Sequence, residues 1–338
     1  MDEEKMSDDE MSAGGPEGAR ALIRELDINA GIKGAAGISF WEPLNRRTSL
    51  GIGGRAEVYA RPADAGALSA LLAAALAGDR PLPVFFLGGG TNLLVTDEQI
   101  RALVISTAGL RGIEIMPEGG STSVISVYAG EPLKKVLAFC MEKGLRGLES
   151  LAGIPGSLGG AVAGNAGANG IEIKDVIRRV HVMDEKGVTR ELTPKQMDFR
   201  YRGSAVLDGS GGPAVAHRGG LIVKAELALE EGDPAEIKNL MKRNFEMKKK
   251  TQPLQARSAG CVFRNPAGHS AGRLIDEAGL KGARIGDIEV SPLHANFFIN
   301  RGEGKAGDFL KLMDRVADEV KKRFGLILEP EIRILQKA

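Results

Sequence analysis

The sequence of 338 residues contains little cysteine, few aromatic residues and no long apolar run. Two cysteines exclude a disulfide framework and are typical of a chain whose thiols stay reduced in the cytosol. No apolar run approaches the roughly 20 residues that a membrane helix needs, and the acidic N-terminus has the opposite charge to that of a secretory signal. We therefore expect a cytoplasmic protein without membrane insertion.

The charge balance and the scarcity of histidine exclude further classes of protein. Lys and Arg number 45 against 44 Asp and Glu, a net charge of +1, so the basic bias of nucleic-acid-binding proteins is absent. Four histidines and two cysteines, none of them clustered, argue against a zinc site. The sequence predicts neither a nucleic-acid partner nor a bound metal.

The pattern of apolar residues divides the chain into a tail and two domains. Residues 1–40 are charged and then Gly/Ala-rich, which predicts a mobile tail with a short helix near 21–26. Residues 41–232 form the first domain, in two parts of about 41–107 and 108–232. Asp233 and Pro234 are typical of a helix start and open the second domain, 233–338.

Periodicity and turn residues locate the elements. In the first domain they predict strands at 56–60, 84–87, 102–106, 123–128, 176–183, 188–192 and 221–229, and helices at 62–77 and 132–143. In the second they predict helices at 234–250, 271–278 and 305–324, and strands at 285–290, 297–300 and 327–335.

Glycine is the residue in excess, with 46 in the chain, about twice the usual share. Gly88, Gly89 and Gly90 follow a predicted strand, and their unhindered N–H groups could form an anion-binding nest or a plain tight turn. Residues 147–170 hold eight more glycines and can scarcely form a regular helix or strand. Either a flat or phosphorylated ligand orders this segment, or it is a structural coil.

A third glycine motif, Gly51-Ile-Gly-Gly-Arg-Ala56, matches the G-x-G-x-x-A pattern of dinucleotide-binding folds. That pattern needs a buried strand before it and a helix after it. Polar residues precede it here and a strand follows, which argues against a Rossmann fold.

The motifs together resemble one family, the UDP-N-acetylenolpyruvoylglucosamine reductases of peptidoglycan synthesis. The resemblance covers about residues 41–335 and is carried, in the family's order, by Pro43–Gly54, Leu87–Leu93, Gly153–Gly167, Phe199–Ser204, Ser258–Pro266, Ala271–Gly282, His294–Asn300 and Leu328–Arg333. It implies an α+β protein: a vanillyl-alcohol-oxidase/PCMH-type FAD-binding fold followed by a smaller α+β substrate-binding domain. The short segment 201–253 resembles the compact variant of the family.

The resemblance implies FAD as cofactor, NADPH as hydride donor and a UDP-sugar enolpyruvyl ether as substrate, in a monomer or weak oligomer. We expect FAD to be held without a covalent bond, since the first glycine loop has no histidine. The expected FAD-binding residues are Arg47, Thr48, Gly53, Gly88, Gly89, Gly90, Thr91, Asn92, Leu93, Gly153, Ile154, Pro155, Gly156, Ser157, Gly159, Gly160, Ala161, Asn165 and Gly167.

The implied reaction adds a hydride and a proton across the vinyl group, which gives a lactyl ether. Negative charge builds on the neighbouring carboxylate and must be stabilised. The family pattern assigns this to Arg202 and Glu331, and the glutamate's pKa should be raised if it is to help. The proton donor position, usually serine in the family, is Cys261 here; a neutral thiol could serve, or else Ser258 or water does.

The expected substrate-binding residues are Asn265, Arg264, Arg273, Lys281 and His294. Two other functions share parts of this pattern. An alcohol or hydroxy-acid oxidase of the same flavin fold would leave the Glu329-Pro330-Glu331 motif without a role. A non-catalytic nucleotide-binding protein would not need Arg202 or Glu331.

Overall fold

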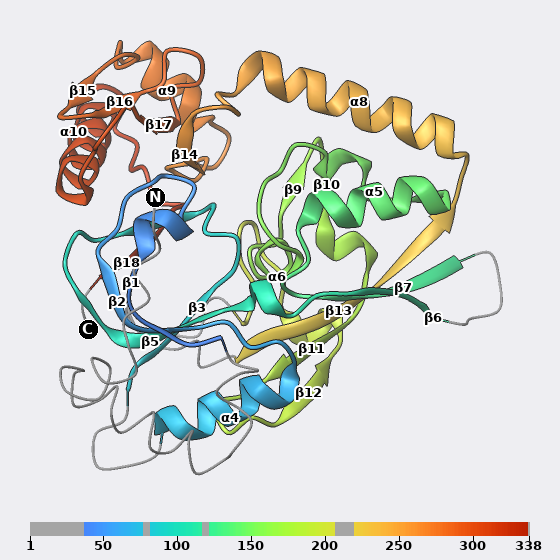
Figure 1. The fold of residues 1–338 in the computed structure, drawn as a ribbon. Coiled ribbons are helices and arrows are strands. Elements are labelled where there is room, and N and C mark those ends of the chain that lie inside the picture. Colours follow the sequence, from blue (N-terminus) through green and yellow to red (C-terminus); the bar gives the residue numbers. More distant parts are fainter. Residues whose placement is uncertain (1–36, 77–81, 117–121, 207–219, 337–338) are drawn as a thin grey trace, which may run out of the picture.

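The computed structural model describes residues 37–76, 82–116, 122–206 and 220–336 (Figure 1). The expected tail up to residue 36, with the helix expected near 21–26, lies outside these residues. Strand β1 (Ser39–Pro43) pairs antiparallel with β2 (Arg55–Ala60). Residues 39 and 40 therefore belong to the first sheet, because their backbone groups find partners there, and not to the tail in which we expected them.

The first domain begins with a four-stranded sheet in the order β1-β2-β5-β3, with β5 at Ile100–Ser106 and β3 at Val84–Leu87. Strands β2, β5 and β3 run parallel, and helix α4 (Ala65–Leu76) packs Leu68 and Leu71 against Val58 and Leu103 of the sheet. The predicted strands are confirmed. The last predicted residue of the helix, 77, lies outside the described residues.

A second, antiparallel sheet follows in the order β12-β11-β13-β7-β6, with β8 pairing at the end of β13. Its strands are β6 (Ile113–Met116), β7 (Thr122–Tyr128), β8 (Leu145–Arg146), β11 (Ile177–Met183), β12 (Thr189–Leu192) and β13 (Leu221–Glu231). Helix α5 (Leu133–Lys143) packs on it and ends at Gly144, whose left-handed φ of 66° favours glycine. Short helical turns fill the connections: η1 (Leu44–Arg47), η2 (Thr107–Gly109), η4 (Ile173–Val176) and α7 (Pro194–Met197).

The glycine-rich segment 147–170 contains more regular structure than its composition predicts. It forms η3 (Glu149–Leu151), α6 (Leu158–Ala163), β9 (Gly167–Ala168) and β10 (Ile171–Glu172). Our expectation that no helix would form was wrong for α6. Ser157 caps its first turn by accepting a hydrogen bond from the Gly160 N–H, and Leu158 and Val162 are fully buried beneath it. Capping and tertiary burial thus outweigh the poor helix propensity of glycine.

Helix α8 (Pro234–Thr251) begins as predicted, with Asp233 accepting hydrogen bonds from the N–H groups of Ala235 and Glu236. Figure 1 shows it returning from the end of β13 toward β14 (Arg257–Cys261). The sequence pattern grouped this helix with the second domain. In the structure it packs on α5 and η3, which are elements of the first.

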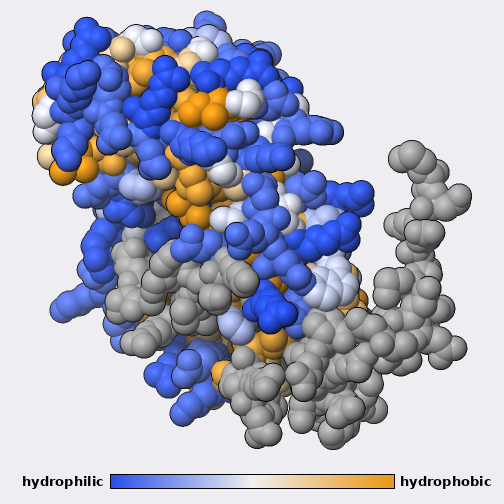
Figure 2. Space-filling view, turned by 90° about the vertical axis from the view of Figure 1, so that its left-hand side faces the viewer, coloured by the Kyte–Doolittle hydropathy of each residue, from blue (hydrophilic) through white to orange (hydrophobic). Residues whose placement is uncertain are grey.

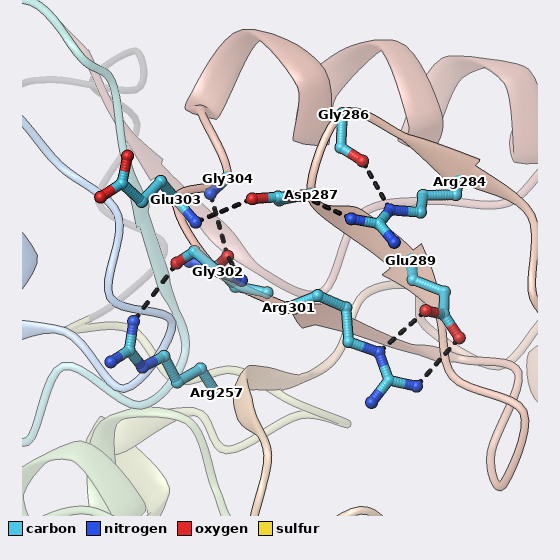
Figure 3. Close-up of polar contacts among 10 residues, drawn as sticks. Arg257, Arg284, Gly286, Asp287, Glu289, Arg301, Gly302, Glu303 and Gly304 are labelled. Atoms are coloured by element: carbon cyan, nitrogen blue, oxygen red, sulfur yellow. Dashed lines mark hydrogen bonds and ion pairs between the residues drawn. The ribbon is translucent and has the colours of Figure 1, made fainter.

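The second domain is a four-stranded sheet in the order β14-β17-β16-β15, packed with α9 (Ala271–Glu277) and α10 (Ala306–Phe324). Strand β17 (Phe297–Asn300) is as predicted. The single strand expected at 285–290 is instead a hairpin of β15 (Arg284–Ile285) and β16 (Ile288–Val290). The chain turns at Gly286, which has a φ of 55°, and Arg284 bonds to the Gly286 carbonyl and to the Asp287 carboxylate (Figure 3).

The apolar stripe predicted on α10 is buried, with Phe309, Leu312 and Val316 fully enclosed. The loop before this helix is fixed by side-chain contacts: Asp287 accepts from the Glu303 N–H and Arg257 donates to the Gly302 carbonyl (Figure 3). Hydrophilic residues cover most of the face of the second domain that Figure 2 shows, with apolar areas between them. None of the helices in the described ranges is long and apolar enough to cross a membrane.

The end of the chain returns to the first domain. Only β18 (Arg333–Leu335) of the strand predicted at 327–335 forms, and it pairs in parallel with β4 (Leu93–Val95). Pro330 lacks an N–H and makes only an isolated bridge with Phe263, which shortens the strand. A second tie runs from the Ala306 N–H at the start of α10 to Asp97, 2.9 Å away.

Candidate active site

A cavity of about 720 Å³ lies where the two glycine loops, β14 and the β18 segment meet. This volume is in the range of sites for cofactors and small molecules. Most of the expected site residues line it: Thr48, Gly88, Gly89, Gly90, Thr91, Asn92, Leu93, Gly153, Ile154, Pro155, Gly156, Ser157, Gly159, Gly160, Ala161, Gly167, Arg202, Cys261, Arg264 and Glu331.

The two glycine loops lie directly against each other at the edge of this cavity. A Cβ on Gly89 would come within 2.7 Å of the Gly156 Cα, and one on Gly88 within 3.0 Å of the Ser157 Oγ. Gly90 has a φ of 63°, and a Cβ there would strike the Arg47 carbonyl at 2.1 Å. Both loops therefore need glycine for backbone-to-backbone packing, and this packing forms the wall of the cavity.

Other glycines leave space on the cavity side. A Cβ on Gly160 would meet only the Ser157 Oγ, at an ordinary 3.6 Å, and one on Gly260 would meet only the Thr91 carbonyl, at 4.0 Å. Bare backbone facing an open cavity allows a ligand to approach closely, and N–H groups of such loops suit phosphate oxygens. The residues present therefore fit FAD, and those of the two loops would hold it.

Arg202 and Glu331 form an ion pair at the cavity. The Arg202 Nε donates to the Glu331 Oε1 at 2.9 Å, and its Nη2 donates to the Gly167 carbonyl at 3.3 Å. Arg202 has a φ of 56°, a strained conformation for a non-glycine residue, and its guanidinium lies over the Tyr201 ring. Such strain persists only where surrounding contacts enforce it, and here the contacts turn the guanidinium toward Glu331.

The backbone of Glu331 is held from two sides. Its N–H donates to the Val262 carbonyl at 2.8 Å, and its carbonyl accepts from the Asn92 side chain at 3.2 Å. Burial raises the pKa of Glu331 above its usual 4.5, while the charges of Arg202 and Arg264 oppose this shift. The expectation of a raised pKa at this carboxyl is thus met by its desolvation.

Cys261 lies next to Val262 and lines the same cavity. Burial, together with the charge of Glu331, raises the pKa of its thiol to about 12, against a smaller opposing influence of Arg202 and Asn296. The thiol is therefore protonated at neutral pH, which is the form that can donate a proton. Burial also raises the pKa of Cys140 to about 12, but this residue lies on the buried side of α5, in the core of the first domain.

Several expected site residues do not line the cavity. Arg47 pairs with Glu42 at 2.6 Å, Gly53 packs against Val95, and Asn165 is fully buried, bonded to the Arg200 carbonyl and the Lys174 N–H. The Asn265 side chain accepts from the Ala271 N–H at the start of α9.

The remaining expected substrate residues have local partners. Arg273 pairs with Glu277 and Lys281 with Asp276, in both cases on the surface around α9. His294 packs edge-on against Phe297, and burial lowers its pKa. Among the residues expected to contact the substrate, the structure thus brings only Arg264 to the cavity.

Lys248 lines the cavity but was not expected there. It lies at the end of α8, on the buried side with Ile237 and Asn244. The positions 237, 241, 244 and 248 have the spacing of one helix face, so the sequence did contain a signal. The lysine-rich end of the helix concealed it, because cations there are also favoured by the helix dipole.

Comparisons with known proteins show to which family the chain belongs. Residues 56–193 match the model of an FAD binding domain, and residues 252–335 match the C-terminal domain of UDP-N-acetylenolpyruvoylglucosamine reductase. The chain is 41% identical over 293 residues to UDP-N-acetylenolpyruvoylglucosamine reductase 2 of Symbiobacterium thermophilum, covering 87% of this chain and 90% of that protein.

Two further relatives extend the comparison. The chain is 42% identical over 298 residues to UDP-N-acetylenolpyruvoylglucosamine reductase of Lactococcus lactis subsp. cremoris, covering 88% of this chain and 94% of that one. A crystal structure of UDP-N-acetylenolpyruvylglucosamine reductase from Thermus caldophilus matches with a TM-score of 0.71 and 33% identity, covering 89% of this chain and 98% of that one.

The expected fold class, an FAD-binding domain followed by a smaller α+β domain, is confirmed. So is the expectation of a flavoprotein oxidoreductase, which removes the non-catalytic alternative. With this fold, this extent of identity and this cavity, the chain belongs to the UDP-N-acetylenolpyruvoylglucosamine reductases, the FAD-binding enzymes of peptidoglycan precursor synthesis.

Proposed function

We propose that this enzyme uses NADPH to reduce the enolpyruvyl ether of UDP-N-acetylglucosamine to the lactyl ether, UDP-N-acetylmuramate, in the cytoplasm. The observation that carries the proposal is the ion pair of Arg202 and Glu331 beside Cys261, at the cavity lined by the two glycine loops. This site combines a carboxylate-binding cation, a carboxyl group of raised pKa and a protonated thiol.

Arg202 and Glu331 would stabilise the charge that develops when hydride reaches the vinyl carbon. That charge spreads onto the substrate's carboxylate, and a planar guanidinium can bind a carboxylate through two parallel bonds. Glu331 already takes one N–H of Arg202, so it orients the guanidinium. Its raised pKa makes it easier to protonate, and a neutral carboxyl does not repel the developing enolate.

Cys261 would supply the proton to the carbon that does not receive hydride. Its pKa of about 12 keeps the thiol protonated until the neighbouring carbon becomes basic. Hydride and proton add across the double bond, so that the enol ether becomes a lactyl ether and NADPH becomes NADP⁺. FAD, which the residues of the two glycine loops would hold without a covalent bond, would supply the hydride transfer from NADPH to the substrate.

The test is a two-step anaerobic experiment. Enzyme purified with its flavin is reduced with one equivalent of NADPH, and the UDP-enolpyruvyl sugar is then added while the flavin absorbance is followed. We expect the absorbance to return without oxygen and mass spectrometry to find a product heavier by two hydrogens. If the absorbance returns only with oxygen, or if a simple alcohol reduces the flavin, the enzyme is an oxidase and the proposal is wrong.

Two variants connect the result to the site. Arg202→Lys keeps a positive charge but loses the planar fork, and it should slow the return of absorbance while leaving the reduction by NADPH unchanged. Arg200→Lys is the matched control two residues away, since that side chain pairs with Asp198 on the surface. Equal effects of the two substitutions would show that Arg202 has no special part in the reaction.

A further inference from the structure

The end of α8 and the η3 turn are joined by buried polar contacts that the proposed reaction does not use. The Lys248 Nζ donates to the Ser150 carbonyl at 3.0 Å and to the Ala152 carbonyl at 2.7 Å. One helical turn earlier, the Asn244 side chain donates to the Glu149 carbonyl at 2.9 Å. Both side chains are buried, at 9% and 7% exposure, and Lys248 also lines the cavity.

The ammonium group of Lys248 has one donor to spare. It carries three N–H donors, and two of them bond to the carbonyls of Ser150 and Ala152. Across the described ranges of the chain, no third acceptor and no carboxylate contacts it. Glu149, the acidic residue of the η3 turn, directs its carboxylate to the Gly147 N–H instead.

A buried ammonium without a counter-charge is expensive in free energy. Burial lowers the pKa of Lys248 from 10.5 to about 8, which records that cost. Two carbonyl dipoles relieve only part of it. An anion placed in the cavity would supply the missing acceptor and charge, and it would restore the ordinary pKa of the lysine.

The charge of the cavity favours an anion as its occupant. Its charged lining side chains are those of Arg202, Lys248, Arg264, Arg333 and Glu331, an excess of positive charge. Arg202 and Glu331 offset each other's charge, so the excess comes from Lys248, Arg264 and Arg333. A Cβ on Gly153 would come within 3.3 Å of the Lys248 Cδ, and the Lys248 Nζ bonds to the carbonyl of the preceding residue, Ala152. The ammonium group therefore adjoins the backbone of the second glycine loop.

We propose that Lys248 binds a diphosphate group at the end of the cavity formed by the second glycine loop. The inference rests on the proposed function, in which the cofactor and the UDP-sugar both carry a diphosphate. Contact with the glycine loop favours the diphosphate of FAD. Lys248 also orders the η3 turn through its two carbonyl bonds, so that the ligand and the loop share one cation.

The experiment measures binding and not turnover. Apo-protein of Lys248→Met is titrated with FAD and with riboflavin, which lacks phosphate, by fluorescence quenching, and FAD-loaded protein is titrated with UDP by calorimetry. We expect FAD affinity to fall about 10- to 100-fold, the usual scale for losing a hydrogen bond to a charged group. Riboflavin affinity should stay within about twofold.

Two control variants separate charge from structure. Lys249→Met removes an exposed neighbouring lysine, and Asn244→Leu removes the other buried tie to the η3 turn without changing charge. Both should keep the wild-type ratio of FAD to riboflavin affinity. If Lys248→Met does not fold, Lys248→Gln replaces it, because its amide can still donate to the carbonyls while carrying no charge.

The titrations separate a diphosphate site from a purely structural role of Lys248. A loss for UDP but not for FAD supports a diphosphate site and assigns it to the substrate. Equal losses of FAD and riboflavin, the same loss in Asn244→Leu, or no loss for any ligand overturns the inference and leaves the proposed function intact. Wild-type protein that binds neither FAD nor UDP overturns the proposed function, and the inference falls with it.

Discussion

Gly89 and Gly156 lie backbone against backbone, so close that a Cβ on the first would be 2.7 Å from the Cα of the second. Each loop thus depends on the other for its shape. A substitution at Gly89 would disturb the packing of the two loops, so a loss of FAD in that variant would not show direct contact with the cofactor. The same is true of Gly159, where a Cβ would meet that of Ala129 at 2.7 Å.

Gly160→Val is the sharper test of the cofactor site. Its Cβ faces the cavity with only the Ser157 Oγ at 3.6 Å, so the fold should survive while the branched side chain occupies space that FAD needs. We expect soluble protein with little bound flavin, measured by the ratio of absorbance at 450 and 280 nm, wavelengths roughly those of flavin and protein absorption. Gly307→Val, in open space at the start of α10, should stay yellow. If Gly160→Val protein carried as much flavin as wild type, the cavity would not be the FAD-binding site.

Cys261→Ala should separate the two halves of the reaction. Reduction of the flavin by NADPH creates no enolate and should keep its rate. The return of absorbance with substrate should slow by about 10²–10⁴, the scale for removing a general acid. Cys261→Ser should recover much of that rate. If Cys261→Ala returns as fast as wild type in stopped-flow traces, the donor is Ser258 or water.

Alkylation gives an independent check on the state of this thiol. With a pKa of about 12, only about one Cys261 in ten thousand is a thiolate at pH 8, and the thiolate is the reactive form. We expect iodoacetamide to label native Cys261 far more slowly than a free thiol, by peptide mass spectrometry. Rapid labelling that bound substrate fails to slow would place the thiol in water and outside the site.

Glu331 should make stability depend on pH. Its pKa is raised in the folded state, so between 4.5 and that raised value the folded protein binds more protons than the unfolded chain. Stability must then fall as pH rises through this window. The side chain of the Glu331→Gln variant cannot titrate. The melting temperature of the variant should therefore rise relative to that of wild type as the pH increases above 4.5. If the melting temperature of Glu331→Gln instead falls relative to that of wild type as the pH rises, the pKa of Glu331 is lowered in the folded protein, as in an ordinary ion pair.

Asp97 should stabilise α10 from outside the second domain. Its carboxylate accepts the Ala306 N–H at 2.9 Å, and Lys305, at the N-cap position, makes no side-chain cap of its own. Asp97→Ala should therefore cost about 0.5–2 kcal/mol in free energy of unfolding, measured in urea. Glu98→Ala, at the exposed neighbouring position, should lower the free energy of unfolding much less. If both substitutions lowered it equally, the loss would come from a change in the loop that holds residues 97 and 98 and not from the missing bond to Ala306.

The sequence predicted local elements best where a single signal decides them. Asp233 and Pro234 start α8, Gly144 ends α5, and β17 has its predicted bounds. The errors arise where distant contacts decide. Helix α6 forms because Leu158 and Val162 are buried by other elements. The residues before Arg333 stay outside β18 because Pro330 lacks an N–H and the Glu331 N–H bonds to the Val262 carbonyl.

The site shows the same division. The motif resemblance brought Arg202, Cys261 and Glu331 together because a family pattern carries three-dimensional information that periodicity lacks. Asn265 and Arg273 were expected to contact the substrate. In the structure Asn265 accepts a hydrogen bond from the first residue of α9, and Arg273 forms an ion pair with Glu277 on the same helix. The place of Lys248 at the cavity could be predicted only from its position on the buried face of α8. A lysine near the C-terminal end of a helix would otherwise be expected in solvent.

The parallel pair of β4 and β18 has a consequence for how the protein is made. The Asn92 side chain bonds to the Glu331 carbonyl across 239 residues of chain, so the first glycine loop meets its partner strand only after those intervening residues have been synthesised. A ribosome exposes the N-terminal domain long before then. The nascent enzyme should therefore acquire a competent flavin site only after β18 has left the ribosome, which makes loading with FAD late relative to the synthesis of the first domain.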